Sequence, residues 1–165
     1  MSAVIEGHHD DHHHHGPAKG ISRWLFTTNH KDIGSLYLWF SFIMLFIGGA
    51  MAMVIRAELF EPGSQIVSPE FYNQMVTNHG LIMVFGVIMP AFVGFANWLV
   101  PMQIGAPDMA LPRLNNLSFW ILPAAFGVLI ATFFMEGGAP NFGWTFYAPL
   151  STEYAPPTVT YFIFA

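Results

Sequence analysis

Residues 34–55 read GSLYLWFSFIMLFIGGAMAMVI and contain no charged side chain. A helix of this length can cross the hydrocarbon core of a bilayer, which is roughly 30 Å thick. Two further apolar runs cover residues from about 76 to 100 and from about 117 to 135, and a fourth begins near residue 158. The sequence therefore predicts an all-α, polytopic transmembrane helical bundle with three complete spans and the start of a fourth. We expect the chain to be a fragment of a longer protein.

The composition excludes several classes of protein. Charged residues make up 9% of the chain and hydrophobic residues 54%, whereas an ordinary soluble domain has about 25% charged residues. A formal net charge of −5 excludes a nucleic-acid-binding protein, because such proteins neutralise phosphates with basic side chains. The absence of cysteine excludes disulfides, Cys-ligated zinc and iron–sulfur clusters. Any metal must be held by His, Met, carboxylate or backbone groups.

The first 20 residues are polar and rich in histidine, with the segment HHDDHHHH at residues 8–15. We interpret residues 1–20 as a disordered cytoplasmic tail, with weak binding of a divalent metal as the alternative. Residues 21–165 then form the transmembrane domain.

The basic residues predict the orientation of the spans, because cytoplasmic loops carry an excess of Lys and Arg. An orientation with the N-terminus inside places four of the five basic residues on the cytoplasmic side. These four are Lys19, Arg23, Lys31 and Arg113, and the fifth is Arg56.

His79 is the first polar residue that suggests chemistry, because ionisable groups inside a bilayer are costly. It shares one helical face with Met83, Gly86, Pro90 and Gly94, since residues three or four apart lie on the same side of a helix. A flat macrocycle could lie against this face with its iron bound by the imidazole. The alternative is a histidine that forms a hydrogen bond to a neighbouring helix.

Arg56 ends a stripe of small residues along the first span. Gly34, Ser41 and Gly48 recur every seven residues, and Ala52 and Arg56 continue the stripe at intervals of four. Such a stripe packs against other helices, so the guanidinium could bind an anionic or carbonyl group of a ligand. The alternative is an arginine at a helix end whose charged group reaches the interface.

Asp108 lies in the loop after the second span, close in sequence to Asn97 and Asn115. A carboxylate at the cytoplasmic mouth of the bundle could begin a proton path, because amides orient water without trapping the proton. The alternative is an aspartate that caps a helix or a turn.

Four segments resemble subunit I of the haem–copper cytochrome c oxidases, and the resemblance extends over nearly all of the chain from Ile21 onward. They are RWLFTTNHKDIG at residues 23–34, IRAEL at 55–59, NWLVPMQIGAPDMALPRLNN at 97–116 and GWTFYAPL at 143–150.

This resemblance implies that His79 is an axial ligand of a low-spin haem A. It also implies that Arg56 donates a hydrogen bond to the formyl group of that haem and that Trp144 lies beside it. Glu58 and Gly63 resemble positions that hold a calcium or sodium ion in some members.

The resemblance further implies a proton-uptake channel that begins at Asp108 and is lined by Asn97 and Asn115. The second haem A and the copper ion of the family take their ligands from segments beyond Ala165. We therefore expect residues 1–165 alone to be inactive.

The implied function is that of the catalytic subunit of a terminal respiratory oxidase in a bacterial inner membrane. It would oxidise cytochrome c, reduce oxygen to water and translocate protons, together with other subunits that include a copper-bearing subunit II. The alternatives are a quinol oxidase of the same superfamily, a haem-free proton-gated transporter, and a non-catalytic membrane or assembly module.

Overall fold

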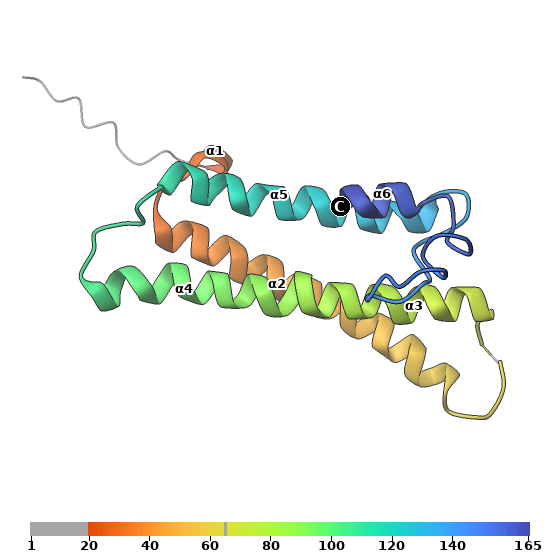
Figure 1. The fold of residues 1–165 in the computed structure, drawn as a ribbon. Helices are drawn as coiled ribbons and strands as arrows, with labels where there is room; N and C mark the ends of the chain where they lie inside the picture. The colour runs from red at the N-terminus through yellow and green to blue at the C-terminus, as the bar shows by residue number, and fades with distance from the viewer. Residues whose placement is uncertain (1–19, 65) are drawn as a thin grey trace, which may run out of the picture.

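The computed structural model describes residues 20–64 and 66–165, which fold into helices and connecting loops (Figure 1). The predicted tail therefore lies outside the described residues, apart from Gly20. The elements are α1 (Ile21–Phe26), α2 (His30–Glu58), α3 (Pro69–Leu81), the π-helix η1 (Ile82–Ile88), α4 (Met89–Ile104), α5 (Pro112–Ala131), the 3₁₀-helix η2 (Thr132–Phe134) and α6 (Val159–Phe164).

Three of the helical segments are long and apolar enough to cross a membrane, namely His30–Glu58, Pro69–Ile104 and Pro112–Phe134. The predicted fold class is confirmed in this respect. The first two helices extend beyond the apolar runs at both ends, and at their N-terminal ends polar residues outside the runs cap them. The Asn29 side chain accepts hydrogen bonds from the N–H groups of Lys31 and Asp32, and Ser68 caps α3 ahead of Pro69. Hydropathy detects the apolar run and misses such caps.

Small residues bring α2 close to the α3–η1–α4 segment, which it crosses in Figure 1. A Cβ on Gly34 would lie 2.9 Å from the Gly94 carbonyl oxygen, and a Cβ on Gly48 would lie 2.7 Å from Met83 Sδ. The predicted stripe of small residues along α2 thus packs against the second spanning helix.

The π-helix η1 precedes Pro90, which has no N–H group to continue the hydrogen-bond ladder. The Met89 N–H reaches back five residues to the Val84 carbonyl. Ser41 Oγ donates to the Val87 carbonyl at 2.8 Å. A neighbouring helix thus stabilises the irregular stretch, as expected where a helix is interrupted inside a membrane.

Aromatic side chains join α2 to α5 in the core. Tyr37 and Phe40 both meet Phe119 edge to face, and Phe40 also meets Phe126. All four side chains are buried, so this cluster fixes the third spanning helix against the first.

Candidate functional site

The candidate residues fall into two groups at the two ends of the bundle. We call the end where α2 begins and α4 ends the Asp108 end. The other, where α2 ends and α3 begins, is the His79 end.

His79 lies in the last turn of α3 and is half-buried. Its Nδ1 is 2.9 Å from the Gly48 carbonyl oxygen of α2. Because a carbonyl can only accept, Nδ1 carries the proton, which leaves the lone pair of the neutral ring on Nε2. Metal-binding histidines show this arrangement, since a hydrogen bond to the second ring nitrogen fixes both tautomer and orientation. The hydrogen-bonded alternative is therefore observed, and it leaves Nε2 able to bind a metal.

The face that His79 shares with Met83, Gly86 and Gly94 is not open. A Cβ on Gly86 would lie 3.1 Å from Phe126 of α5 and 3.3 Å from Met44 of α2, and a Cβ on Gly94 would lie 2.9 Å from Leu38 of α2. Side chains of α2 and α5 therefore occupy this face at Gly86 and Gly94, and the haem contact of His79 remains a prediction.

Trp144 is placed beside His79 by the loop that follows η2. Its indole ring packs on Gly80, whose added Cβ would lie 3.5 Å from Trp144 Cδ1. Two hydrogen bonds attach this loop to α3. The Gly143 N–H donates to Thr77 Oγ1 at 3.0 Å, and Asn78 Nδ2 donates to the Pro140 carbonyl at 3.0 Å.

Arg56 lies two turns beyond Gly48, where the end of α2 diverges from α3 in Figure 1. Its side chain is exposed and forms no hydrogen bond or ion pair with residues 20–64 or 66–165. No hydrogen bond therefore joins Arg56 to His79 or Trp144.

Glu58 is buried, with 6% of its surface exposed. Its Oε2 accepts the N–H groups of Ile66 at 2.8 Å and Val67 at 3.0 Å, so it stabilises the loop after α2. Gly63, in the same loop, is exposed and has a φ of 100°. Within the described part of the chain, no three His, Asp or Glu side chains gather as metal ligands. A cation here would need backbone oxygens, because calcium takes six to eight oxygen ligands.

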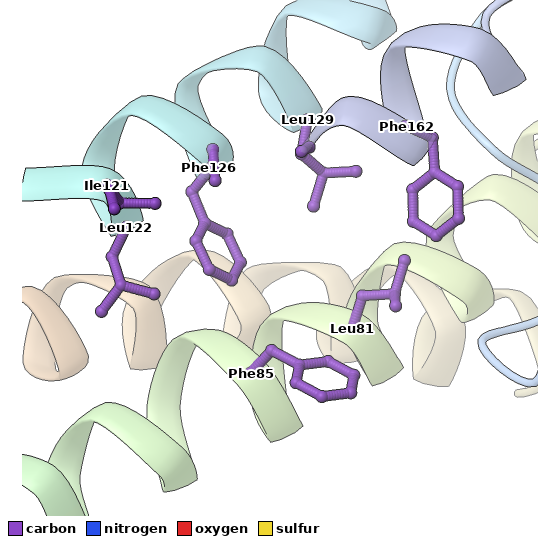
Figure 2. Close-up of a pocket in the computed structure, with 9 residues that line it drawn as sticks. Leu81, Phe85, Ile121, Leu122, Phe126, Leu129 and Phe162 are labelled. Carbon is purple, nitrogen blue, oxygen red and sulfur yellow. The ribbon is translucent and has the colours of Figure 1, made fainter. Parts of the chain in front are cut away.

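A cavity of about 360 Å³ lies between the α3–η1 segment, α5 and α6 (Figure 2). Its lining is hydrophobic throughout, and its side chains offer no nitrogen or oxygen ligand to a metal. The labelled residues are Leu81, Phe85, Ile121, Leu122, Phe126, Leu129 and Phe162.

At the Asp108 end, Asn97 connects three helices. Its side chain is 2% exposed, and its Oδ1 accepts a hydrogen bond from Asn115 Nδ2 of α5. Its own Nδ2 donates to the Val93 carbonyl at 2.9 Å. Its backbone carbonyl oxygen is 2.7 Å from His30 Nδ1 of α2. Asn97 thus lies in a buried hydrogen-bond network that joins α2, α4 and α5.

Asp108 reaches the same network from the loop between α4 and α5. Its Oδ1 accepts the N–H of His30, the first residue of α2, at 3.2 Å, and that of Met109 at 2.7 Å. The carboxylate therefore caps α2 from a distant part of the chain, where a negative charge at a helix N-terminus is favourable. The predicted trio of Asp108, Asn97 and Asn115 does come together.

Sequence reasoning missed His30, which is 5% exposed and connects Asp108 to Asn97. The sequence feature that could have identified it is a histidine directly after Asn29, the residue that caps α2.

The Asp108 end also carries an ion pair in which Arg23 Nη2 and Nε lie 2.8 Å and 3.2 Å from the Asp32 carboxylate. This hydrogen-bonded carboxylate raises the pKa of Arg23.

The sequence profile of the family "Cytochrome C and Quinol oxidase polypeptide I" matches residues 32–165. Among curated proteins, a probable cytochrome c oxidase subunit 1-alpha of Streptomyces avermitilis is 50% identical over 145 residues, which are 87% of this chain and 25% of that protein. Cytochrome c oxidase subunit 1 of Corynebacterium diphtheriae is 47% identical over 87% of this chain and 26% of its own length. The haem–copper oxidase subunit I+III of Aeropyrum pernix is 48% identical over 84% of this chain and 17% of its own length. The chain thus spans about a quarter, or less, of the length of these relatives.

Proposed function

The chain belongs to the cytochrome c and quinol oxidase polypeptide I family, and we propose that its full-length protein is the catalytic subunit of a terminal oxidase. That protein would oxidise cytochrome c, reduce oxygen to water and translocate protons across a bacterial plasma membrane. It would work with other subunits, including a copper-bearing subunit II.

The observation that carries this proposal is the hydrogen bond from His79 Nδ1 to the Gly48 carbonyl. It directs the Nε2 lone pair away from α2, as an axial ligand of a low-spin haem A requires. When bound, the haem supplies one-electron transfer. Trp144 would pack near it, and the exposed Arg56 could donate to its formyl group if the full-length protein brings the guanidinium within reach.

The second part of the proposal concerns proton uptake at the Asp108 end, which we place on the cytoplasmic side with the N-terminus. Asp108 would take up the proton at the surface. The amides of Asn97 and Asn115 would then orient water molecules along the path without binding the proton themselves. The buried hydrogen bonds that fix Asn97 support this role, because a water path needs donors and acceptors of constant orientation.

The second haem A and the copper ion would take their ligands from parts of the full-length protein that this chain does not include. The donor is proposed to be cytochrome c rather than a quinol. Glu58 and the backbone near Gly63 would contribute oxygen ligands to a calcium or sodium ion.

The experiment compares reduced-minus-oxidised spectra of membranes that carry the full-length protein, His79→Ala or His30→Ala. Both histidines donate Nδ1 to a backbone carbonyl of another helix, so His30→Ala is a matched control for the loss of that bond. We expect the low-spin haem A signal to disappear in His79→Ala and to persist in His30→Ala. A signal that survives His79→Ala would refute the ligand assignment.

A second measurement separates the remaining alternatives. Pyridine haemochrome spectra distinguish haem A from haem B, and oxygen consumption with reduced cytochrome c or with a quinol identifies the donor. A full-length protein without haem would favour the proton-gated transporter instead.

A further inference from the structure

A groove with a volume of about 420 Å³ lies on the surface of the bundle between α2 and α4, toward the Asp108 end, and is lined by none of the candidate site residues. Leu38, Trp39, Phe42 and Trp98 provide its apolar walls, and Ser35 contributes a hydroxyl. Trp39 and Phe42 are 63% and 50% exposed. The groove therefore faces the surroundings of the spanning helices rather than the core.

A positive charge lies at one end of this groove. Lys31 is exposed, and its Nζ is 5.7 Å from the centre of the Trp98 ring. Among the described residues Lys31 has no acidic partner, because the neighbouring Asp32 carboxylate is bound by Arg23. The ammonium group is thus available to an anion from outside the chain.

Hydrogen bonds fix the wall beside this charge. Trp98 Nε1 donates to Ser35 Oγ at 3.3 Å, and Ser35 Oγ donates to the Lys31 carbonyl at 2.8 Å. The indole ring is thereby held under the ammonium group.

We propose that this groove binds an anionic phospholipid, with its phosphate at Lys31 and one acyl chain along Leu38 and Phe42. Lys31 is the second residue of α2, so it lies at the level of the lipid headgroups. Phe42 lies 11 residues further along α2, about 16 Å at a rise of about 1.5 Å per residue. That distance matches half of a hydrocarbon core of about 30 Å, which is the depth that one acyl chain spans.

The positive charge of Lys31 favours an anionic phospholipid over an apolar helix as the ligand of this groove. An uncharged helix of another protein would leave Lys31 without a partner, whereas a basic pocket at the end of spanning helices suits a lipid phosphate. The cavity of Figure 2 has no such charge, so it identifies no ligand. The lipid proposal holds whether or not the full-length protein binds haem.

The test uses delipidated full-length protein titrated with phosphatidylglycerol or phosphatidylcholine, with bound lipid counted by native mass spectrometry. Wild type should prefer phosphatidylglycerol. Lys31→Gln should lower its affinity about fivefold, as expected for one basic residue at a membrane surface, and should leave phosphatidylcholine unchanged. Lys31→Arg should keep the preference. Arg113→Gln, which removes another exposed cation from the same end but not from the groove, should have no effect.

Phe42→Ala removes an apolar wall and should weaken the binding of both lipids. A photoreactive phenylalanine analogue at position 42 should capture phosphatidylglycerol in native membranes. Capture of a polypeptide segment there would overturn the proposal. An equal loss of both lipids in Lys31→Gln, or no loss at all, would also overturn it.

Discussion

His30 and His79 lie toward opposite ends of the bundle, and each donates Nδ1 to a backbone carbonyl of a neighbouring spanning helix. Their surroundings differ. His30 is buried next to Asn97, and its own N–H is accepted by Asp108. His79 is half-buried, and its Nε2 has no hydrogen-bond partner within the described chain. His30 is thus buried within the hydrogen-bond network of the Asp108 end, whereas the half-buried His79 keeps Nε2 accessible to a ligand.

This difference separates a structural role from a binding role for two similar side chains. Burial of a polar group is costly unless it forms hydrogen bonds, and at the Asp108 end the Asn97 amide and the His30 backbone N–H form theirs within the chain. At the His79 end the imidazole of His79 forms such a bond through Nδ1. We therefore propose the haem at His79 and not at His30, because the half-buried ring of His79 is open to a ligand and the ring of His30, 5% exposed, is not.

The largest effect is expected from Gly34→Ala, which would force α2 and α4 apart near the Asp108 end. A Cβ at position 34 would lie 2.6 Å from Trp98 Cδ1 and 2.9 Å from the Gly94 carbonyl. Because that backbone cannot move aside, Gly34→Ala should lower the free energy of unfolding by about 3 kcal/mol. At the His79 end, the Cβ added by Gly48→Ala would clash with Met83 Sδ. Because this flexible side chain can rotate away, we expect the free energy of unfolding to fall by only about 1 kcal/mol.

Thermal unfolding of the two full-length variants in detergent would measure this contrast, with Gly49→Ala as the control. A Cβ on Gly49 meets no atom within 4 Å, so this change should not destabilise the protein. Equal losses for Gly34→Ala and Gly48→Ala would contradict the proposed difference in rigidity.

The second prediction compares the two histidines in haem-free protein. His30→Ala leaves the buried Asn97 carbonyl without its donor and should cost about 2 kcal/mol, within the range for an unsatisfied buried group. His79→Ala should cost about 1 kcal/mol, because its surroundings are more exposed. In haem-loaded protein the order should reverse, since only His79 would then bind the iron. Unfolding curves with and without haem would show which of the two variants loses more stability in each state. If His30→Ala remained the more destabilising change in haem-loaded protein, that would argue against His79 as the ligand.

The sequence was sufficient for the three spans and for the trio at the Asp108 end. Uncharged apolar runs predict spanning helices because the bilayer leaves few other structures for them. The trio was found because amides and a carboxylate close in sequence surround one loop.

The sequence did not reveal which surface each helix buries. The face with His79 and Gly86 suggested space for a macrocycle, yet small residues in two helices are equally suited to close packing, as Gly48 shows. His30 was missed because its partners, Asn97 and Asp108, are 67 and 78 residues away. Periodicity within one helix cannot report such contacts.

The third prediction compares the carboxylates of the two ends. Asp108 and Glu58 each accept two backbone N–H groups through one oxygen, and an amide oxygen can accept the same bonds. Asp108→Asn and Glu58→Gln should therefore each cost only about 0.5 kcal/mol. Only Asp108→Asn should slow proton uptake and oxygen reduction, because an amide cannot take up a proton. If Glu58→Gln slowed proton uptake and Asp108→Asn did not, the proton entrance would lie at the His79 end, and the proposed role of Asp108 would be refuted.

The smallest effect concerns the ion pair between Arg23 and Asp32, which lies on the surface at the Asp108 end. Arg23→Gln should lower the melting temperature less than any of the destabilising changes above, and the difference should vanish in high salt, because exposed pairs are weak and screened. The hydrogen-bonded Asp32 raises the pKa of Arg23. A raised pKa in a cation means that its contribution is complete at every pH below the ordinary arginine value and is lost only above it. Between about pH 6 and 9, well below that value, the difference between wild type and Arg23→Gln should therefore not change with pH. A difference as large as that of Gly34→Ala would show that the Asp108 end depends on its surface charges more than on its packing.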